Sequence, residues 1–323
     1  MAGREIAVAD ETQTADPPRR GGVVGAVVRH LAYPFRRGAT PAVRPSTGFY
    51  TDTTVCIGCK ACEVACKQWN QLPADGFEWS GNSYDNTGQL SAESWRHVKF
   101  VEQFAPTHPA TTPGPLAPGR VSLGLVPSTP ELPAADGRWL MMSDVCKHCV
   151  TAPCQQACPT GAIVYNEFGN VYIQPDICNG CAYCVAACPF GVITRSHFDG
   201  HAHKCTLCYD RQKDGLVPAC AKACPTASIQ FGPVEELRAK ATKRVADLQQ
   251  RGMAGAYLYG DAPTATYSEL NSFYLLVDKP EVYGLPAAAV NPWVHMAGDY
   301  ARAAGAGLVA LALFAGCLFF GGR

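Results

Sequence analysis

The chain has 323 residues, of which 47% are hydrophobic, so it can bury a core and form one large domain or two small ones. Its 27 basic and 27 acidic residues give a formal net charge of +0 at pH 7, which argues against nucleic acid as a bulk partner. Sixteen of its 17 cysteines fall in four runs of four, here called quartets, and Cys317 stands alone. A secreted disulfide scaffold would be shorter and would not repeat one spacing.

Residues 1–48 are predicted to form a basic arm rather than a domain. From residue 17 to residue 50 the chain has six arginines and no acidic residue. Arg19 and Arg20 precede an apolar run, as in a twin-arginine export signal, but Arg29 interrupts that run and no small-residue cleavage site follows at a suitable distance. The arm could instead lie along a partner or near lipid head groups, or it could be a solvated tail.

Residues 49–104 contain the first quartet. Its members follow the spacing C-x2-C-x2-C-x3-C and are Cys56, Cys59, Cys62 and Cys66. Lys67, rather than a proline, follows the last of them. The alternation of residues 95–104 predicts a strand, and the Pro-rich run 105–138 predicts a long surface loop.

Residues 139–200 are predicted to form a central unit with two quartets. The second quartet is Cys146, Cys149, Cys154 and Cys158, and the third is Cys178, Cys181, Cys184 and Cys188. In both, the last cysteine follows three intervening residues and directly precedes a proline; the third has the strict spacing, whereas the second has a C-x4-C gap. We expect strands at 139–142 and 190–194, and a hairpin between the quartets with its turn at Gly169 and Asn170.

The spacing of these two quartets is that of two-cluster bacterial ferredoxins. There, each run binds one 4Fe–4S cluster with three cysteines and the other cluster with its fourth. The proline fixes φ and stops the turn from continuing as a helix. The spacing therefore predicts two crossed ligand sets. One is Cys146, Cys149, Cys154 and Cys188, and the other is Cys178, Cys181, Cys184 and Cys158.

Residues 201–232 contain the fourth quartet and are predicted to pair with residues 49–104. The fourth quartet is Cys205, Cys208, Cys220 and Cys224. By the same rule, Cys56, Cys59, Cys62 and Cys224 would bind a third cluster, and Cys205, Cys208, Cys220 and Cys66 a fourth. Sixteen ligands make four clusters with none left over. A zinc-stabilised scaffold is the alternative, because C-x2-C pairs also bind zinc, although zinc sites usually stop at four ligands.

Residues 233–302 are predicted to form a helix followed by a surface strap. The helix is expected over 233–251, because apolar residues recur there at steps of three and four. These residues are Val234, Leu237, Ala241, Val245 and Leu248. Residues 254–292, which are rich in aromatic residues, are expected to be the irregular strap.

Residues 303–322 carry no charge and match the length of one bilayer crossing, which predicts a single-pass transmembrane helix in the cell membrane. Arg302 and Arg323 bracket the run, and these flanking charges are too balanced to set the orientation of the helix. We expect Cys317 to be a bystander within this helix rather than a ligand.

The quartets imply electron transfer rather than catalysis. A cluster held by four thiolates leaves no open position for a substrate, and the sequence has no Ser–His–Asp arrangement, phosphate loop or nucleotide fingerprint. We therefore expect no catalytic site in this chain. His148 is expected to lie beside the ligands or in solvent rather than to bind metal. Five lysines near ligand cysteines could raise reduction potentials or be ordinary surface residues: Lys60, Lys67, Lys147, Lys204 and Lys222.

Several stretches are similar to one protein family. They are C-I-G-C-K-A-C-E-V-A-C-K-Q-W-N, S-Y-D-N with L-S-A-E-S-W, C-N-G-C-A-Y-C-V-A-A-C-P-F, and K-C-T-L-C-Y-D-R with P-A-C-A-K-A-C-P-T. They resemble the iron–sulfur (beta) subunit of membrane-bound formate dehydrogenase from about Tyr50 to Pro286. The cysteines alone indicate only the four-cluster subunits of molybdopterin oxidoreductases. The stretches S-Y-D-N and K-P-E-V-Y-G-L-P narrow the resemblance to formate dehydrogenase.

The resemblance implies an α+β fold with two ferredoxin-like 4Fe–4S dicluster halves, long loops and a C-terminal transmembrane helix. It implies four 4Fe–4S clusters that take electrons from a catalytic subunit with a molybdenum or tungsten molybdopterin cofactor. The electrons would pass to an integral membrane subunit that binds haem b or reacts with quinone. Related nitrate-reductase subunits lack one ligand cysteine and carry a 3Fe–4S cluster, whereas sixteen cysteines here favour four full clusters. The equivalent subunit of another molybdopterin enzyme or of a hydrogenase is the nearest alternative.

Overall fold

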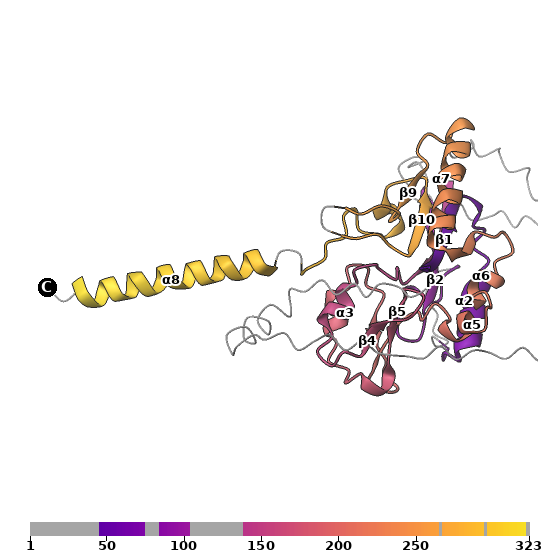
Figure 1. Ribbon diagram of the computed structural model, residues 1–323. Helices are drawn as coiled ribbons and strands as arrows, with labels where there is room; N and C mark the ends of the chain where they lie inside the picture. Colours follow the sequence, from indigo (N-terminus) through magenta and orange to yellow (C-terminus); the bar gives the residue numbers. More distant parts are fainter. Residues whose placement is uncertain (1–44, 75–83, 104–137, 265–266, 294–295, 321–323) are drawn as a thin grey trace, which may run out of the picture. The chain divides into compact units, whose positions relative to one another are not determined.

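The computed structural model describes residues 45–74, 84–103, 138–264, 267–293 and 296–320 (Figure 1). Short helices and strands are mixed along the chain, in agreement with the coarse α+β prediction. The predicted basic arm and the predicted Pro-rich loop lie outside the described residues, except for a few residues at their ends. The first strand of the described chain, β1, begins at Thr47, within the last residues of the predicted arm.

A four-stranded sheet joins the start of the described chain to its later part. Its strands are β1 (Thr47–Asp52), β8 (Ile229–Pro233), β9 (Tyr257–Tyr259) and β10 (Ser272–Leu276), in the order β8-β1-β10-β9. β1 runs antiparallel to β8 and parallel to β10, and β9 runs antiparallel to β10. The sheet therefore places the segment before the first quartet beside the segment after the fourth.

The prediction of an irregular surface strap over residues 254–292 is wrong at β10. Phe273 and Leu275 pack with helix α7 (Val234–Gln250), whereas Tyr274 and Leu276 pack on the opposite face with Leu140 and Met142. Alternate residues of a strand point to opposite faces, so both faces of β10 are buried. A strand buried on both faces is a continuous apolar run without alternation, which is why its pattern was not recognisable as a strand.

Helix α7 confirms the prediction from the apolar spacing. Its buried side chains are Val234, Leu237, Ala241 and Leu248, and Val245 packs partly buried beside them. Pro233 directly precedes the helix, and two glutamates lie in its first turn, where acidic side chains interact favourably with the helix dipole. The helix covers one face of the sheet next to β1 (Figure 1).

Strands β2 (Arg96–Gln103) and β3 (Arg138–Val145) form an antiparallel pair along their whole length. They confirm the strands predicted at 95–104 and 139–142, although β3 is longer than expected. β3 ends at Val145, directly before Cys146, and β2 begins opposite that point because Arg96 pairs with Val145. The ladder thus fixes where the second quartet starts.

The hairpin between the second and third quartets is confirmed. It consists of β4 (Ile163–Tyr165) and β5 (Val171–Ile173). The Asn166 carboxamide oxygen accepts hydrogen bonds from the backbone N–H groups of Phe168 and Asn170, which fixes the turn. Gly169 has φ +69°, a conformation that glycine adopts without steric cost.

The strand predicted at 190–194 is wrong in position. A turn follows Cys188, because the Gly191 N–H donates to the Cys188 carbonyl oxygen and Gly191 has φ +62°. The strand that does form, β6 (Thr194–Arg195), pairs with β7 (Ala202–His203). The apolar residues Val192 and Ile193 are buried without being part of a strand.

Apart from α7 and the C-terminal helix, the helices among the described residues are short. They are α2 (Ala61–Asn70), α3 (Pro153–Ala157), α4 (Tyr183–Ala187), α5 (Tyr209–Lys213) and α6 (Ala219–Lys222), with 3-10 turns η2 (Thr53–Val55), η3 (Pro175–Ile177) and η4 (Pro280–Tyr283).

Helix α8 (Met296–Phe320) has 25 residues and is the one helix of the described chain that is long and apolar enough to cross a membrane. The candidate span, Gly298–Cys317, begins before the predicted start at residue 303. Asp299 and Arg302 form an ion pair with 2.5 Å between Oδ1 and Nη2, so the helix begins in a charged turn. Cys317 lies in the helix and is exposed.

Candidate metal centres

Three cavities are each lined by four cysteines, and a fourth set of four cysteines is buried nearby. We name these sets as groups. The first group is Cys146, Cys149, Cys154 and Cys188. The second group is Cys158, Cys178, Cys181 and Cys184, and the third group is Cys56, Cys59, Cys62 and Cys224. Each cavity encloses an empty volume of about 290 to 300 Å³, including the part that opens to solvent. In every cavity, three cysteines come from one quartet and the fourth from another.

The fourth group is Cys66, Cys205, Cys208 and Cys220, all of which are buried. Burial raises the pKa of the Cys66 thiol well above its usual range, and interactions with the three other thiols of the group raise it further. Cys66 and Cys220 lie on α2 and α6, which pack against each other. The packing of these two helices therefore brings the last cysteine of the first quartet to three cysteines of the fourth.

A repeated backbone feature bends the chain around each set of cysteines. In every quartet, the residue directly before the second cysteine has a left-handed conformation, with φ between +43° and +69°. These residues are Gly58, His148, Gly180 and Leu207. At non-glycine positions such a conformation costs of the order of 1–3 kcal/mol and persists only where the surroundings enforce it. At Gly58 a Cβ would lie 2.6 Å from Phe100 Cε1, so a side chain would also clash.

The residue after the fourth cysteine decides how far the preceding helix extends. Helices α3 and α4 end directly before Cys158 and Cys188, each of which is followed by a proline. Helix α2 instead continues past Cys66 to Asn70, because Lys67 can remain helical. The proline thus ends the helix, as the sequence predicted. Without a proline after its fourth cysteine, the first quartet has a longer helix.

The burial of the cysteines affects their protonation. Burial raises the pKa of Cys62 to about 12 and those of Cys184 and Cys208 to about 11, although Arg96 and Ser143 partly oppose the shift at Cys62. At Cys158 burial acts in the same direction, but hydrogen bonds from Thr160 and backbone N–H groups outweigh it and lower the pKa. Most of these thiols are therefore protonated without metal, and binding iron as thiolates must release protons.

The donor set fits an iron–sulfur cluster better than a single ion. All 17 cysteines lie in described residues and none forms a disulfide, so a disulfide framework is excluded. Among the described residues, no three His, Cys, Asp or Glu side chains converge as a single metal ion requires. A zinc ion draws four thiolates to about 2.3 Å from one point, whereas these thiols line the walls of a cavity.

Comparison with known proteins places these cysteines in a family. Residues 137–234, which contain the second, third and fourth quartets, match the model of a 4Fe-4S dicluster domain. The formate dehydrogenase iron-sulfur subunit of Haemophilus influenzae is 38% identical over 237 residues, covering 73% of this chain and 67% of that protein. The formate dehydrogenase-O iron-sulfur subunit of Escherichia coli is 37% identical over 268 residues, covering 78% of each. The protein is a member of the family of formate dehydrogenase iron–sulfur subunits.

The family membership confirms the resemblance found from the sequence motifs, and it establishes the molecule as an iron–sulfur protein with 4Fe–4S clusters. A more distant relative is the B subunit of the anaerobic dimethyl sulfoxide reductase of Escherichia coli, which is 30% identical over 198 residues, covering 60% of this chain and 76% of that protein. The relatives are named iron–sulfur or B subunits, in agreement with the absence of a catalytic motif in the sequence.

The five lysines predicted to lie near the cysteine ligands differ from one another in exposure and in bonding partners. Lys222 is exposed, whereas Lys60 lines the cavity of the third group and forms ion pairs with Glu63 and Asp85. Lys67 donates to the carbonyl oxygens of residues 73 and 93. Lys147 and Lys204 are the two that are buried.

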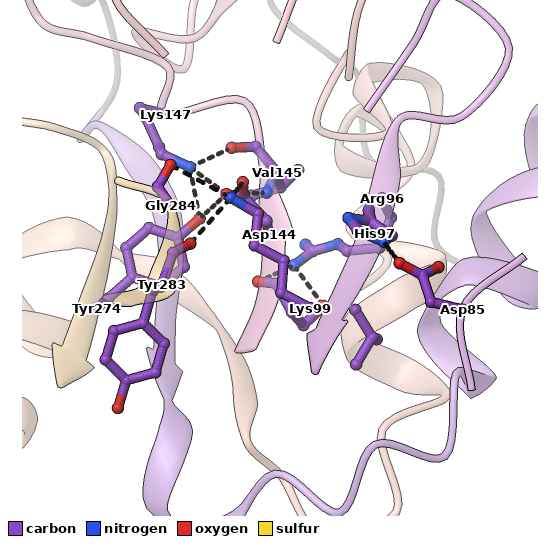
Figure 2. A network of polar contacts seen from close by, with 12 residues as sticks. Asp85, Arg96, His97, Lys99, Asp144, Val145, Lys147, Tyr274, Tyr283 and Gly284 are labelled. Atoms are coloured by element: carbon purple, nitrogen blue, oxygen red, sulfur yellow. Dashed lines mark hydrogen bonds and ion pairs between the residues drawn. The ribbon is translucent and has the colours of Figure 1, made fainter. Parts of the chain in front are cut away.

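Lys147 is the centre of a buried polar network (Figure 2). Its ammonium forms an ion pair with Asp144 and donates to the Val145 carbonyl oxygen at 2.8 Å and to the Tyr274 hydroxyl at 3.0 Å. Lys99 also contacts Asp144, with 3.0 Å between Nζ and Oδ2. Burial alone would raise the pKa of Asp144, but Lys147 and Lys99 hold it below its usual range. The network ties β3 to β10 directly before Cys146.

His148 lines the cavity of the first group and is fully buried. The possibility of a solvated side chain is therefore wrong. Neither ring nitrogen has a hydrogen-bond partner among the described residues. Burial lowers its pKa well below the usual value, and the charges of Lys204 and Arg96 add to this effect, so the ring is neutral.

Several side chains that contact thiols of the four groups were not predicted from the sequence. The Tyr267 hydroxyl donates to Cys149 Sγ at 2.8 Å, and Ser143 Oγ lies 3.2 Å from Cys62 Sγ. Arg96 Nη2 donates to Cys220 Sγ at 3.1 Å, and Asn70 Nδ2 donates to Cys66 Sγ at 3.6 Å. Asn70 lies four residues after Cys66, one helical turn, so its position follows from sequence spacing.

Proposed function

We propose that this protein is the electron-transfer subunit of a formate dehydrogenase complex. It would carry electrons from a molybdopterin catalytic subunit, with molybdenum or tungsten, to an integral membrane subunit that binds haem b or reacts with quinone. The observation that carries the proposal is the identity of 36–38% with formate dehydrogenase iron–sulfur subunits over most of the sequence. The subunit has no catalytic site of its own in this proposal.

We assign the four cysteine groups as the ligands of the four 4Fe–4S clusters. The lining of three cavities by the first, second and third groups supports this assignment, as does the proximity of the four thiols in the fourth group. Bound 4Fe–4S clusters supply one-electron chemistry and leave no ligand position for a substrate. The protein contributes the thiolates, largely apolar surroundings and a fixed order of the groups.

Interactions between thiols of different groups support one continuous series. Cys62 of the third group interacts with Cys220 of the fourth, and Cys205 of the fourth interacts with Cys146 of the first. Helices α3 and α4 pack against each other; each carries a cysteine of one of the first two groups, and the cysteine directly after each helix belongs to the other of these groups. The series would therefore run from the third group through the fourth and the first to the second.

The domain organisation is proposed on the same basis. Residues 139–200 would form one dicluster half, and residues 49–104 would form the other with residues 201–232. The pairing of β1 with β8 and the packing of α2 on α6 support the second half. Helix α8 would anchor the protein in the membrane as a single span, which its length and apolar composition support.

The direct test is purification of the protein with its native partners. We expect a brown complex that contains about sixteen iron atoms in this subunit and reduces a viologen dye when formate is added, since four 4Fe–4S clusters contain sixteen irons. A colourless protein with zinc and no iron would contradict the cluster assignment. A loaded complex that does not oxidise formate would contradict the assigned partner.

The likeness to the B subunit of dimethyl sulfoxide reductase makes another molybdopterin oxidoreductase the second candidate. The same purified complex separates the two candidates. Reoxidation of a reduced viologen by dimethyl sulfoxide, without formate oxidation, would favour the second candidate. Formate-dependent dye reduction without a response to dimethyl sulfoxide would favour the first.

A further inference from the structure

A buried arginine lies between the third and fourth cysteine groups. Arg96, the first residue of β2, is only 2% exposed. Its Nη2 donates to Cys220 Sγ of the fourth group at 3.1 Å. Its Nη1 donates to Ser143 Oγ at 3.3 Å, and Ser143 Oγ lies 3.2 Å from Cys62 Sγ of the third group. One guanidinium therefore connects the two groups, directly on one side and through a hydroxyl on the other.

The charge of this guanidinium has no carboxylate partner among the residues that the structure describes. The groups that stabilise its charged form are the thiols of Cys220, Cys62 and Cys205, with a smaller contribution from Tyr274. The Phe49 ring lies 4.7 Å from the guanidinium carbon, and Arg96 Nε has no hydrogen-bond partner. A fully buried cation is unfavourable unless an anion faces it, so the compensating charge must come from the two cysteine groups.

The proposed clusters would provide that charge. We infer that Arg96 is a positioning residue that holds the third and fourth groups together and raises the reduction potentials of clusters bound there. The inference rests on the proposed function, because it requires a cluster at each group. A cluster bound at either group would gain one negative charge on accepting an electron from the proposed molybdopterin catalytic partner. The nearby guanidinium stabilises that more negative state.

The fork of the guanidinium is essential to this role. Nη1 and Nη2 donate in different directions, one toward Ser143 and the other toward Cys220. A lysine would keep the charge but has a single nitrogen on a flexible stem, so it would not hold both contacts. Arg96 should therefore be distinguishable from a residue that provides charge alone.

The experiment is a redox titration of the purified complex, with the 4Fe–4S signals followed by low-temperature electron paramagnetic resonance. We expect R96Q to shift two of the four reduction steps to lower potential and to leave the other two in place. The shift should be larger at the fourth group, where the contact is direct. S143A should shift only the reduction potential of the third-group step. R96K should shift the potentials of the third-group and fourth-group steps, but by less than R96Q does. C59S and C208S identify the signals of the third and fourth groups.

Arg238 provides a matched control. It is a largely buried arginine whose guanidinium is paired with Glu235 and Glu269, so R238Q should leave all four steps unchanged. Unchanged steps in R96Q, or equal shifts of all four steps, would overturn the inference. If R96Q does not assemble, the redox titrations of R96K and S143A test the inference instead. A third-group reduction step at the wild-type potential in both variants would overturn the inference. Absence of four steps in the wild-type complex would instead refute the proposed function, before any variant is compared.

Discussion

Two buried cations near the cysteine groups differ in what neutralises them. Lys147 is paired with Asp144 and bonded to Tyr274, as Figure 2 shows, whereas Arg96 is surrounded by thiols, a hydroxyl and an aromatic ring. The Lys147 charge is balanced within the protein and serves mainly to join β3 to β10. In the assignment proposed above, anionic clusters at the third and fourth groups would balance the Arg96 charge. A buried cation near a redox site that has no carboxylate partner is therefore informative about the charge of the group bound at that site.

The largest expected effect comes from removing the carboxylate at Lys147. In D144N, Lys147 stays fully buried without an anion, and breaking a buried ion pair in this way costs about 3–5 kcal/mol. We expect a sharply reduced yield of the iron-loaded complex and a lower apparent melting temperature. If D144N assembles and melts like the wild type, Lys147 and Asp144 do not form the structural tie described here.

Asp278 provides the control for that variant. It is paired with Arg138, but both side chains are partly exposed, at 20% and 52%. An exposed ion pair contributes less than about 1 kcal/mol, so D278N should have little effect on yield or melting temperature. An equal loss of yield and melting temperature in D144N and D278N would mean that the effect does not depend on the burial of the ion pair.

A smaller effect is expected from removing the cation of the same pair. In K147M, Asp144 keeps Lys99 and the Val145 N–H as partners, so no unpaired charge remains buried. We therefore expect K147M to destabilise the complex less than D144N. Melting curves of the two purified variants compare them directly. A larger drop in melting temperature in K147M than in D144N would contradict the assignment of Asp144 as the residue on which the network depends.

The sequence predicted the regular elements with distinct patterns. Apolar residues at steps of three and four located α7, and alternation located β2 and the β4–β5 hairpin. For three of the four groups, the cysteine spacing predicted which thiols line one cavity, because the ferredoxin spacing implies that the fourth cysteine of one quartet joins three cysteines of another. The residue after the fourth cysteine also controls the local backbone. The contrast between the helix ends at Cys158 and Cys66 shows this local control directly.

The remaining features depend on tertiary contacts. β10 was missed because a strand covered on both faces shows no alternation. Arg96 and Tyr267 were missed because an arginine in a strand and a tyrosine in a loop have the composition of surface positions. Their contacts with Cys220 and Cys149 arise between segments more than a hundred residues apart in the sequence. No periodicity within one segment indicates such contacts.

The smallest expected effect concerns the backbone rather than a buried charge. Ala182, directly before α4, has φ +63°, and a left-handed conformation costs an alanine about 1–2 kcal/mol that glycine does not incur. We expect A182G to raise the apparent melting temperature of the complex slightly. Ala186 in the interior of α4 is the control, because A186G should lower it. A decrease in both variants would show that the left-handed conformation at residue 182 is not strained.

The crossed assignment of the fourth cysteines is the claim on which the electron path depends. The most direct test is low-temperature electron paramagnetic resonance of C158A, with C181A and C149A as references for loss of the second and the first group. We predict that C158A loses or alters the signal that C181A affects and keeps the signal that C149A affects. If C158A instead alters the C149A signal and leaves the C181A signal intact, Cys158 serves its own quartet and the crossed arrangement is contradicted.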